Sequence, residues 1–371
     1  MRSSKQLLLD SRLFAKDDRR RSWWVLLSTM ALLAALIAVC VADLHWAIRV
    51  GASLISGLTL VRLFIIYHDY QHGTILKGSR IAGALMTLYG LATLNAPSIW
   101  ARSHDHHHKN NAKVFGAAIG SYPVMTTTSW ARASRGQRVA YLIQRHPLTI
   151  LAGYLTIFLY GMTIRSLINN PREHWDSAVS LMVHFGLIGL TTYFIGPDVM
   201  LLAVVGPCTF ASAIGGYLFY AQHNYPAMKI RDRANWDYVY AAIHSSSYIP
   251  MNPVSAWFTG NIGFHHVHHL NFRIPFYNLP QAMAAFEELQ NPGGTTLWPW
   301  DIVRCLKLKL WDAKLDRLIS LAEYRRNQEA AAKQSLSTSA TPGQPVAAKA
   351  VAIKPGATST KDSKSGDTVA A

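Results

Sequence analysis

The sequence of residues 50–72 is VGASLISGLTLVRLFIIYHDYQH, an apolar run that ends on two histidines four positions apart. The apolar part, from Val50 to Tyr67, is long enough to cross a bilayer as a helix. Its arginine, Arg62, lies near the inner end, where a long side chain can reach the lipid headgroups. Residues four apart project from one face of a helix. The stretch therefore predicts a transmembrane helix that delivers His68 and His72 to the membrane surface.

Two further histidine clusters repeat this helical spacing. They are HDHHH at residues 104–108 and HHVHH at residues 265–269. An i, i+3, i+4 pattern brings three side chains to one face of a helix, which selects His104, His107, His108, His265, His268 and His269. His106 and His266 point off these faces and are predicted not to be ligands. Imidazole binds iron, copper and zinc well. Because eight nitrogens are too many for one ion, the clusters predict a centre of two metal ions.

The composition is that of a membrane protein. Half of the 371 residues are apolar and 15% are charged, against roughly 25% charged residues in soluble domains. Eleven tryptophans agree with this class, since tryptophan is enriched at the level of the lipid headgroups. The net charge of +16 lies mainly in the N-terminal arm, the loops and the tail, as in cytoplasmic loops. We therefore predict no nucleic-acid partner.

These features predict an all-α integral membrane protein. We expect about four transmembrane helices and a cytoplasmic helical cap that holds the histidine-rich site. Residues 1–22 are predicted to be a basic cytoplasmic arm, 23–324 the membrane domain with its cap, and 325–371 a disordered low-complexity tail. Within the cap, residues 281–324 are predicted to be amphipathic helix. The arginines at 19–21 indicate a cytoplasmic N-terminus.

The number of crossings follows from the shared site. Helices at about 23–42 and 50–67 are predicted to cross outward and back, and residues 81–100, broken by glycines and a proline, to form an interfacial hairpin. Three later apolar runs lie at about 148–168, 178–196 and 199–221. An even number of them has to cross, because the third cluster lies on the side of the first two. One run is therefore not a full span, and the sequence leaves open which.

Other residues near the clusters have more ordinary interpretations. Asp69 and Asp105 each follow a predicted ligand and are candidates to orient its imidazole through the second ring nitrogen. Isolated histidines are usually surface or core residues, and this interpretation covers His45, His146 and His174. His184 lies in an apolar run and is predicted to pack between helices. His244 is left open between a place facing the site and a turn cap.

The order H-x-x-x-H, H-x-x-H-H, H-x-x-H-H resembles the membrane fatty acid desaturases. The likeness is closest at 257–279, where GFHHVHHL (263–270) precedes PFYN (275–278), and it is similar to acyl-lipid desaturases of the delta-12 and omega-3 type. The resemblance implies a non-haem di-iron centre, dioxygen as oxidant and two electrons from an external carrier. It implies that hydrogen leaves two adjacent methylenes of a membrane acyl chain, giving a cis double bond and water. It also adds His223, in the pair Gln222–His223, as a ninth ligand.

The complete set of predicted ligands has nine histidines: His68, His72, His104, His107, His108, His223, His265, His268 and His269. The first box, HDYQHG at 68–73, departs from delta-12 enzymes, which commonly have a Cys-Gly pair between the histidines. It also resembles carotenoid ketolases and hydroxylases of the same superfamily. The alternative function is therefore a di-iron membrane hydroxylase or ketolase that acts on a carotenoid or an alkane. A metal transporter is disfavoured, because His184 is the only histidine deep in an apolar run.

A separate electron donor is expected, either a ferredoxin or a cytochrome. The family's fused cytochrome domain carries His-Pro-Gly-Gly, whereas Asn291-Pro-Gly-Gly294 lacks the histidine and is interpreted as a turn. Such carriers are often acidic, so the basic stretch from Arg132 to Arg145 is a candidate docking face. The protein is interpreted as a multi-pass protein of a bacterial inner membrane, with both termini and the active site cytoplasmic.

Overall fold

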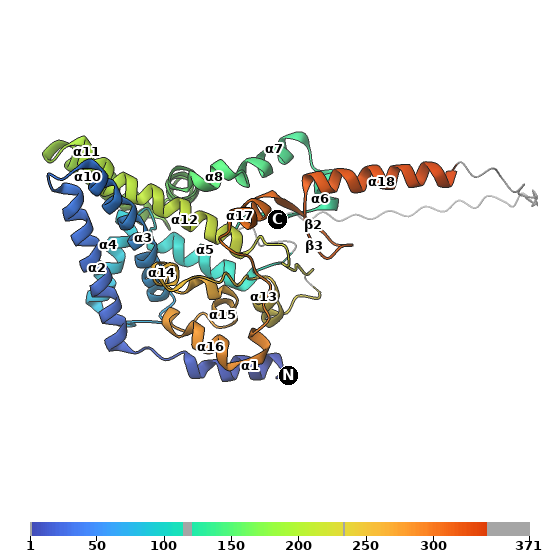
Figure 1. The fold of residues 1–371 in the computed structure, drawn as a ribbon, viewed down its shortest axis with the longest axis horizontal. Coiled ribbons are helices and arrows are strands. Elements are labelled where there is room, and N and C mark those ends of the chain that lie inside the picture. The colour runs from blue at the N-terminus through green and yellow to red at the C-terminus, as the bar shows by residue number, and fades with distance from the viewer. Residues whose placement is uncertain (1, 114–120, 233, 340–371) are drawn as a thin grey trace, which may run out of the picture. The chain divides into compact units, whose positions relative to one another are not determined.

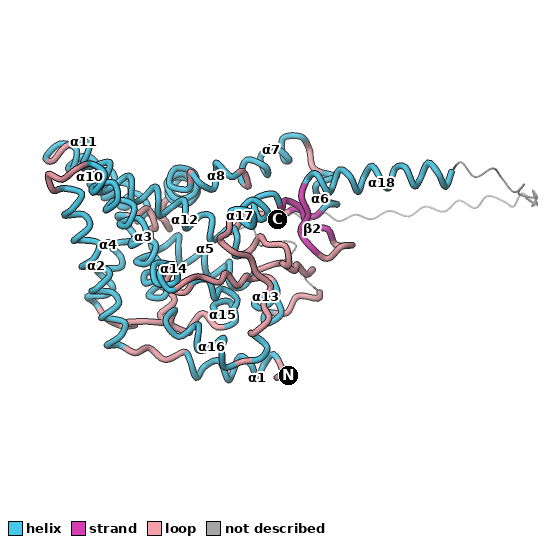
Figure 2. The backbone as a smooth tube through the Cα atoms, in the orientation of Figure 1, coloured by secondary structure: helices cyan, strands magenta, loops and turns pink. Residues whose placement is uncertain are grey.

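Among the residues that the structure describes, four apolar helical segments are long enough to cross a membrane, and Figures 1 and 2 show how the helices are arranged. They are α2 (Arg19–Val41), α3 (Trp46–Gln71), α10 (Trp175–Phe194) and Pro197–Gln222, which consists of α11 (Pro197–Met200), η3 (Leu201–Val205) and α12 (Gly206–Gln222). This computed structural model describes residues 2–113, 121–232 and 234–339. The prediction of a mostly helical protein with about four apolar spans is confirmed.

Helix α3 is the centre of the apolar part, because α2 and α12 both pack against it. A Cβ atom at Gly57 would lie 2.9 Å from the Phe210 ring, so this glycine allows α3 and α12 to approach closely. Asp18 caps α2 by accepting hydrogen bonds from the backbone N–H groups of Arg20 and Arg21. The three arginines therefore form the first turn of α2, and the predicted arm contains α1 (Ser4–Ser11) and η1 (Arg12–Phe14).

The run at 148–168 does not form a membrane-length α-helix. It consists of α8 (Pro147–Leu151), the π-helix η2 (Tyr154–Ile164) and α9 (Arg165–Asn169). The two candidate spans of this region are α10 and Pro197–Gln222, joined at Gly196, whose φ of 134° favours glycine. Their number is even, as the shared site requires. The wide turns of η3 end just before Pro207, where the missing proline N–H disturbs regular α-helix.

The segment between the first two histidine clusters consists of two short helices. It forms α4 (Arg80–Ala92) and α5 (Pro97–Asn110). Helix α4 is apolar but has 13 residues, fewer than a span of about 20 needs. It packs against α10, and Pro97 begins α5 at a position that proline suits. This hairpin agrees with the prediction for residues 81–100.

A layer of short helices covers the ends of α3 and α12. It contains α13 (Tyr238–His244), α14 (Pro253–Phe258), η4 (Ile262–Phe264), α15 (His265–Leu270), η5 (Phe276–Asn278), α16 (Leu279–Ala285) and η6 (Glu287–Leu289). One hydrophobic core joins this layer to the spans: Ile66 of α3, Tyr220 of α12 and Val267 of α15 belong to it and are buried. The layer, which we call the cap, is therefore packed firmly onto the apolar helices.

The prediction of amphipathic helix over 281–324 is wrong for its second half. After α17 (Pro299–Lys307), strands β2 (Leu308–Asp312) and β3 (Arg317–Ser320) form an antiparallel hairpin, and β1 (Met125–Thr126) pairs with β2 in parallel. Leu308 and Leu310 are buried on either side of the less buried Lys309, the period-two pattern of a strand. Asp312 accepts hydrogen bonds from two backbone N–H groups of the turn.

The remaining elements are α6 (Thr127–Arg132), α7 (Arg135–Gln144) and α18 (Leu321–Ser339). Helix α18 continues into the predicted tail as far as residue 339. The chain divides at Arg325 into two units, and α18 crosses this boundary. The rest of the predicted disordered tail, residues 340–371, lies outside the described residues.

Candidate metal centre

The first two clusters lie on two helices, one at the C-terminal end of α3 and the other along α5. His68 is in the last turn of α3 and His72 is its C-terminal cap, while His104, His107 and His108 lie in the second half of α5. The imidazole ring centroids of His68 and His104 are 4.7 Å apart. The predicted helical faces of both clusters are therefore turned toward each other.

The third cluster and His223 approach from the other side. His223 ends α12, and α15 of the cap presents His265, His268 and His269. The Nε2 atom of His268 lies 3.0 Å from that of His108, and the Nε2 atoms of His265 and His223 are 2.9 Å apart. The structure thus gathers all nine predicted ligands, which come from four separate stretches of the chain.

The nine histidines form two groups whose candidate ligand atoms lie within 4.8 Å of one another. The five-histidine group contains His68, His72, His104, His108 and His268, and the four-histidine group contains His107, His223, His265 and His269. The first cluster belongs to the five-histidine group alone, whereas the second and third clusters each contribute to both groups. Two ions would therefore be held by overlapping sets of helices, which agrees with a two-metal centre.

The spacing of the nitrogens fits a metal ion. In the four-histidine group the Nε2 atoms form a closed ring with sides of 3.0, 2.9, 3.0 and 3.2 Å, in the order 107, 223, 265, 269. Neighbouring ligands with metal–nitrogen bonds of about 2.1 Å at right angles are separated by about 3 Å. In the five-histidine group, no described residue hydrogen-bonds the buried Nε2 atom of His72, as expected of an atom reserved for a metal.

The protein environment keeps these imidazoles neutral. Burial lowers the pKa of both His72 and His223 to about 4. Burial first, and then the neighbouring imidazoles, hold the pKa of the six ligands on α5 and α15 well below 6.5. Neutral imidazole is the form that binds metal ions. The site is therefore ready for a cation at neutral pH.

Two hydrogen bonds fix which ring nitrogen faces the centre. Nδ1 of His223 lies 3.0 Å from the backbone carbonyl oxygen of Ser245, and a carbonyl can only accept, so Nδ1 carries the proton. Nδ1 of His68 lies 3.0 Å from Oδ1 of Asp69. The lone pair of His223 is then on Nε2, toward the metal groups, and an ionised Asp69 would orient His68 in the same way. Asp69 is itself held by the backbone N–H of Phe276, at 2.7 Å from Oδ2.

Asp105 does not share this arrangement. Its side chain is exposed and forms an ion pair of 2.6 Å with Lys109, one turn further along α5. Of the two candidate orienting carboxylates, the structure brings only Asp69 to a predicted ligand histidine. Sequence reasoning also missed Trp100, whose ring stacks on His104 with centroids 4.4 Å apart. Its position four residues before His104 is the signal that was available.

The other histidines lie outside the two groups. His266 is buried with Nε2 3.3 Å from the carbonyl oxygen of Leu289. His45 and His146 cap α3 and α8 through Nδ1. His184 is buried between the hydroxyl of Tyr154, at 2.6 Å, and the carbonyl of Ala92, at 2.7 Å, which is the predicted helix-packing role. His244 ends α13 beside a surface hollow, so it does not face the centre.

Comparisons with known proteins show the family of this chain. The profile of the family "Fatty acid desaturase" matches residues 44–300. A fatty acid desaturase of Bacillus subtilis (strain 168) is 30% identical over 320 residues, covering 85% of this chain and 90% of that protein. The sn-1 acyl-lipid omega-3 desaturase (ferredoxin) of Nostoc sp. (strain 36) is 25% identical, covering 66% and 71%. The sn-1 oleoyl-lipid 12-desaturase of Anabaena variabilis is 21% identical, covering 74% and 78%. The chain is a membrane oxidoreductase that belongs to the fatty acid desaturase family.

Proposed function

We propose that this enzyme introduces a cis double bond into an acyl chain of a membrane lipid, with dioxygen as oxidant and two electrons from a separate donor. The observation that carries the proposal is the pair of histidine groups, one of five and one of four, at the ends of two membrane-length helices. A redox centre at that position is within reach of a lipid tail. The names of the cyanobacterial relatives, which act on lipid-bound acyl chains, support the same substrate class.

We propose two iron ions as the metals, bound by the nine histidines named above. Five nitrogens in one group exceed the four ligands of a structural zinc site, and no described cysteine lies in either group. Bound iron supplies one-electron redox chemistry and activation of dioxygen. The overall balance removes two hydrogens from adjacent methylenes, adds two electrons and two protons, and converts dioxygen into two molecules of water.

The chain's own residues prepare the site for this reaction. Asp69 and the Ser245 carbonyl hold His68 and His223 with Nε2 toward the groups. Trp100 and Phe272 stack on His104 and His72, so the ligand rings cannot turn away. Buried or half-buried, and held neutral, the histidines are preorganised for a cation. Since the cap covers them, bulk water is largely kept from the centre.

We also propose the orientation in the membrane. The histidine-bearing ends of α3 and α12 lie on one side, together with the start of α2 at its three arginines. Positive residues favour the cytoplasmic side, so the site and the N-terminus are assigned to the cytoplasm, in a bacterial inner membrane. A cysteine introduced at Asp43, in the loop between α2 and α3, should react with a membrane-impermeant maleimide in intact cells. Labelling only after the cells are opened would reverse the assignment.

Expression with fatty acid profiling tests the activity. The full chain is produced in a bacterial host that lacks polyunsaturated lipids, and double bonds are located by mass spectrometry. New double bonds are expected with the wild type and not with His107→Ala. His106→Ala is the matched control, because this neighbour lies outside both metal groups, and it should keep the activity. Oxygenated carotenoids or alkanes without new double bonds would replace the proposal by the hydroxylase or ketolase alternative.

A further inference from the structure

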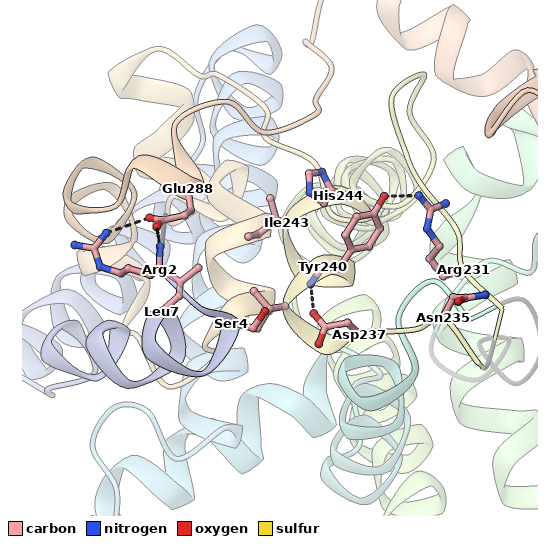
Figure 3. A pocket seen from close by; sticks show the side chains of 11 residues that line it. Arg2, Ser4, Leu7, Arg231, Asn235, Asp237, Tyr240, Ile243, His244 and Glu288 are labelled. Carbon is pink, nitrogen blue, oxygen red and sulfur yellow. Dashed lines mark hydrogen bonds and ion pairs between the residues drawn. The ribbon is translucent and has the colours of Figure 1, made fainter.

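One short helix separates the metal centre from a hollow in the protein surface. Helix α13 turns Tyr238, Ala241 and Ala242 toward His108 and His269. Its other side, with Val239, Tyr240, Ile243 and His244, lines a hollow of about 470 Å³ (Figure 3). The hollow lies between α13 and the N-terminal helix α1, and its wall also includes Arg231 and Glu288. At this place the centre is one helix away from the surface.

Tyr238 connects this helix directly to a predicted ligand. Its hydroxyl donates a hydrogen bond of 2.7 Å to the backbone carbonyl of His269. The Nε2 atom of His269 belongs to the closed ring of the four-histidine group. The rate of electron tunnelling falls steeply across empty space and more slowly through bonds and hydrogen bonds. Tyr238 and His269 therefore offer a continuous path from the surface layer to the centre.

Trp236 extends this path to the edge of the hollow. Its ring centroid lies 6.4 Å from that of Tyr238, and its neighbours Asn235 and Asp237 line the hollow. The indole N–H donates a hydrogen bond of 2.8 Å to the carbonyl of Asn111. The ammonium of Lys113 lies 4.1 Å from the ring centroid, a cation–π contact. These contacts hold a half-buried aromatic ring at a fixed place between solvent and the centre.

We propose that the one-electron carrier docks over this hollow and that electrons enter through Trp236 and Tyr238. The inference rests on the proposed function, which requires a separate donor. We commit to an iron–sulfur protein of the ferredoxin class, because the name of the omega-3 desaturase of Nostoc sp. includes ferredoxin. Each docked carrier is oxidised by one electron and the metal centre is reduced by one, so two encounters supply the electron pair consumed with dioxygen. No electron needs to remain on either aromatic ring.

The surface of the hollow suits a transient protein partner. Arg2 pairs with Glu288 at 3.1 Å and Arg231 with Asp316 at 2.7 Å, so charges of both signs surround it, as in the polar interfaces of short-lived electron-transfer complexes. The basic stretch at 132–145 is less suitable. Arg145 is fully buried, and exposed Val139 and Ile143 accompany the arginines of α7, a mixture typical of a helix lying on lipid.

The route is tested by separating reduction of the centre from the later chemistry. Ferredoxin reduced beforehand is mixed without oxygen with iron-loaded enzyme, and reduction of the centre is followed spectroscopically. Tyr238→Leu and Trp236→Leu are expected to slow this reduction about tenfold. Tyr238→Phe, which keeps the ring and loses only the hydrogen bond, is expected to slow it less. The same enzymes, reduced by dithionite and then given oxygen, should form product within about twofold of wild type.

Two further variants make the result specific. Phe272→Leu removes the aromatic ring that contacts His72 and His108. This variant tests Phe272 as an alternative entry point for electrons. Trp300→Leu removes a tryptophan that is 83% exposed on α17 and is the control. The proposal is overturned if Phe272→Leu alone slows reduction, or if the Tyr238 and Trp236 variants reduce at the wild-type rate. Absence of product from dithionite-reduced wild type would instead contradict the proposed function.

Docking is tested by blocking the hollow. Asn235→Cys modified with a bulky maleimide should raise the KM for reduced ferredoxin about tenfold, with kcat at saturating ferredoxin nearly unchanged. Asp43→Cys carrying the same group, in the loop between α2 and α3, is the matched control. Of the three native cysteines, Cys40 and Cys305 are buried and Cys208 is half-buried within the apolar segment Pro197–Gln222, which limits background labelling. An equal KM for both labelled proteins would place the donor elsewhere.

Discussion

The dipeptide His-Asp occurs in both of the first two histidine clusters, and its aspartates behave differently. Asp69 is 2% exposed, contacts the ring of His68 and accepts the backbone N–H of Phe276. Asp105 is exposed and pairs with Lys109. The same two residues on two helices therefore give one carboxylate that contacts a predicted ligand and one that faces solvent.

The difference comes from what covers each helix. The end of α3 is enclosed by the cap, where the backbone of Phe276 reaches Asp69 from more than two hundred residues away in the sequence. Helix α5 turns its histidines inward and leaves Asp105 outside. A carboxylate next to a ligand thus has an orienting role only where a second segment buries it and satisfies its other oxygen.

The largest effect is expected from replacing a histidine in either cluster, because both clusters supply predicted ligands. Both His68→Ala and His104→Ala remove a nitrogen from the five-histidine group, so each should lower product formation by at least about a hundredfold. Metal analysis of the purified proteins should show loss of one of the two ions. A variant that retained full activity would show that the histidine in question is not a ligand.

Removal of the metal should destabilise the whole centre. The lone pairs of nine imidazoles face one another and repel unless a cation lies between them. A metal ion that binds only the folded state raises the free energy of unfolding. Treatment with a strong iron chelator should lower the apparent Tm in detergent by several degrees, about what a few kcal/mol produce. Added ferrous iron should restore it. An unchanged Tm in fully metal-free protein would contradict this dependence.

A smaller effect distinguishes the two aspartates. In Asp69→Asn the amide can accept from either His68 or Phe276, but it presents N–H to the other donor. We expect activity and iron affinity to fall about ten- to a hundredfold, as for other residues that orient metal ligands. Iron affinity is measured by competition with a chelator. Wild-type iron affinity in this variant would show that Asp69 does not orient a metal ligand.

Asp105→Asn should have the smallest effect. It breaks an exposed i, i+4 ion pair, which contributes no more than about 0.5 kcal/mol. Turnover and iron content are expected to remain within about twofold of wild type. An effect as large as that of Asp69→Asn would mean that Asp105 reaches a ligand in the working enzyme, and the contrast between the clusters would disappear.

Spacing in the sequence was sufficient to predict which histidines of each cluster the structure brings together. The pattern i, i+3, i+4 selected His104, His107 and His108 and set His106 aside, because a helix fixes the direction of its own side chains. The family resemblance was needed for His223, which stands alone on its helix. Spacing did not separate Asp69 from Asp105, since it carries no information on the distant segment that covers α3.

Two parts of the fold were not predicted, because the sequence patterns that indicate them are weak. Hydropathy alone did not show that residues 154–164 form a π-helix and that the run 148–168 is not a candidate span. The alternation in residues 308–312 is short and follows an amphipathic helix directly, so helix was predicted where β2 forms. In both cases the packing around the segment decided its structure.

We propose that each of the two histidine groups binds one iron ion. This proposal is tested most directly by metal analysis and Mössbauer spectroscopy of the full-length protein, produced with iron-57 and purified in detergent. We predict two iron ions per chain, present as two inequivalent high-spin sites because one group has five histidines and the other four. A single metal ion per chain, or zinc in place of iron in active protein, would contradict it.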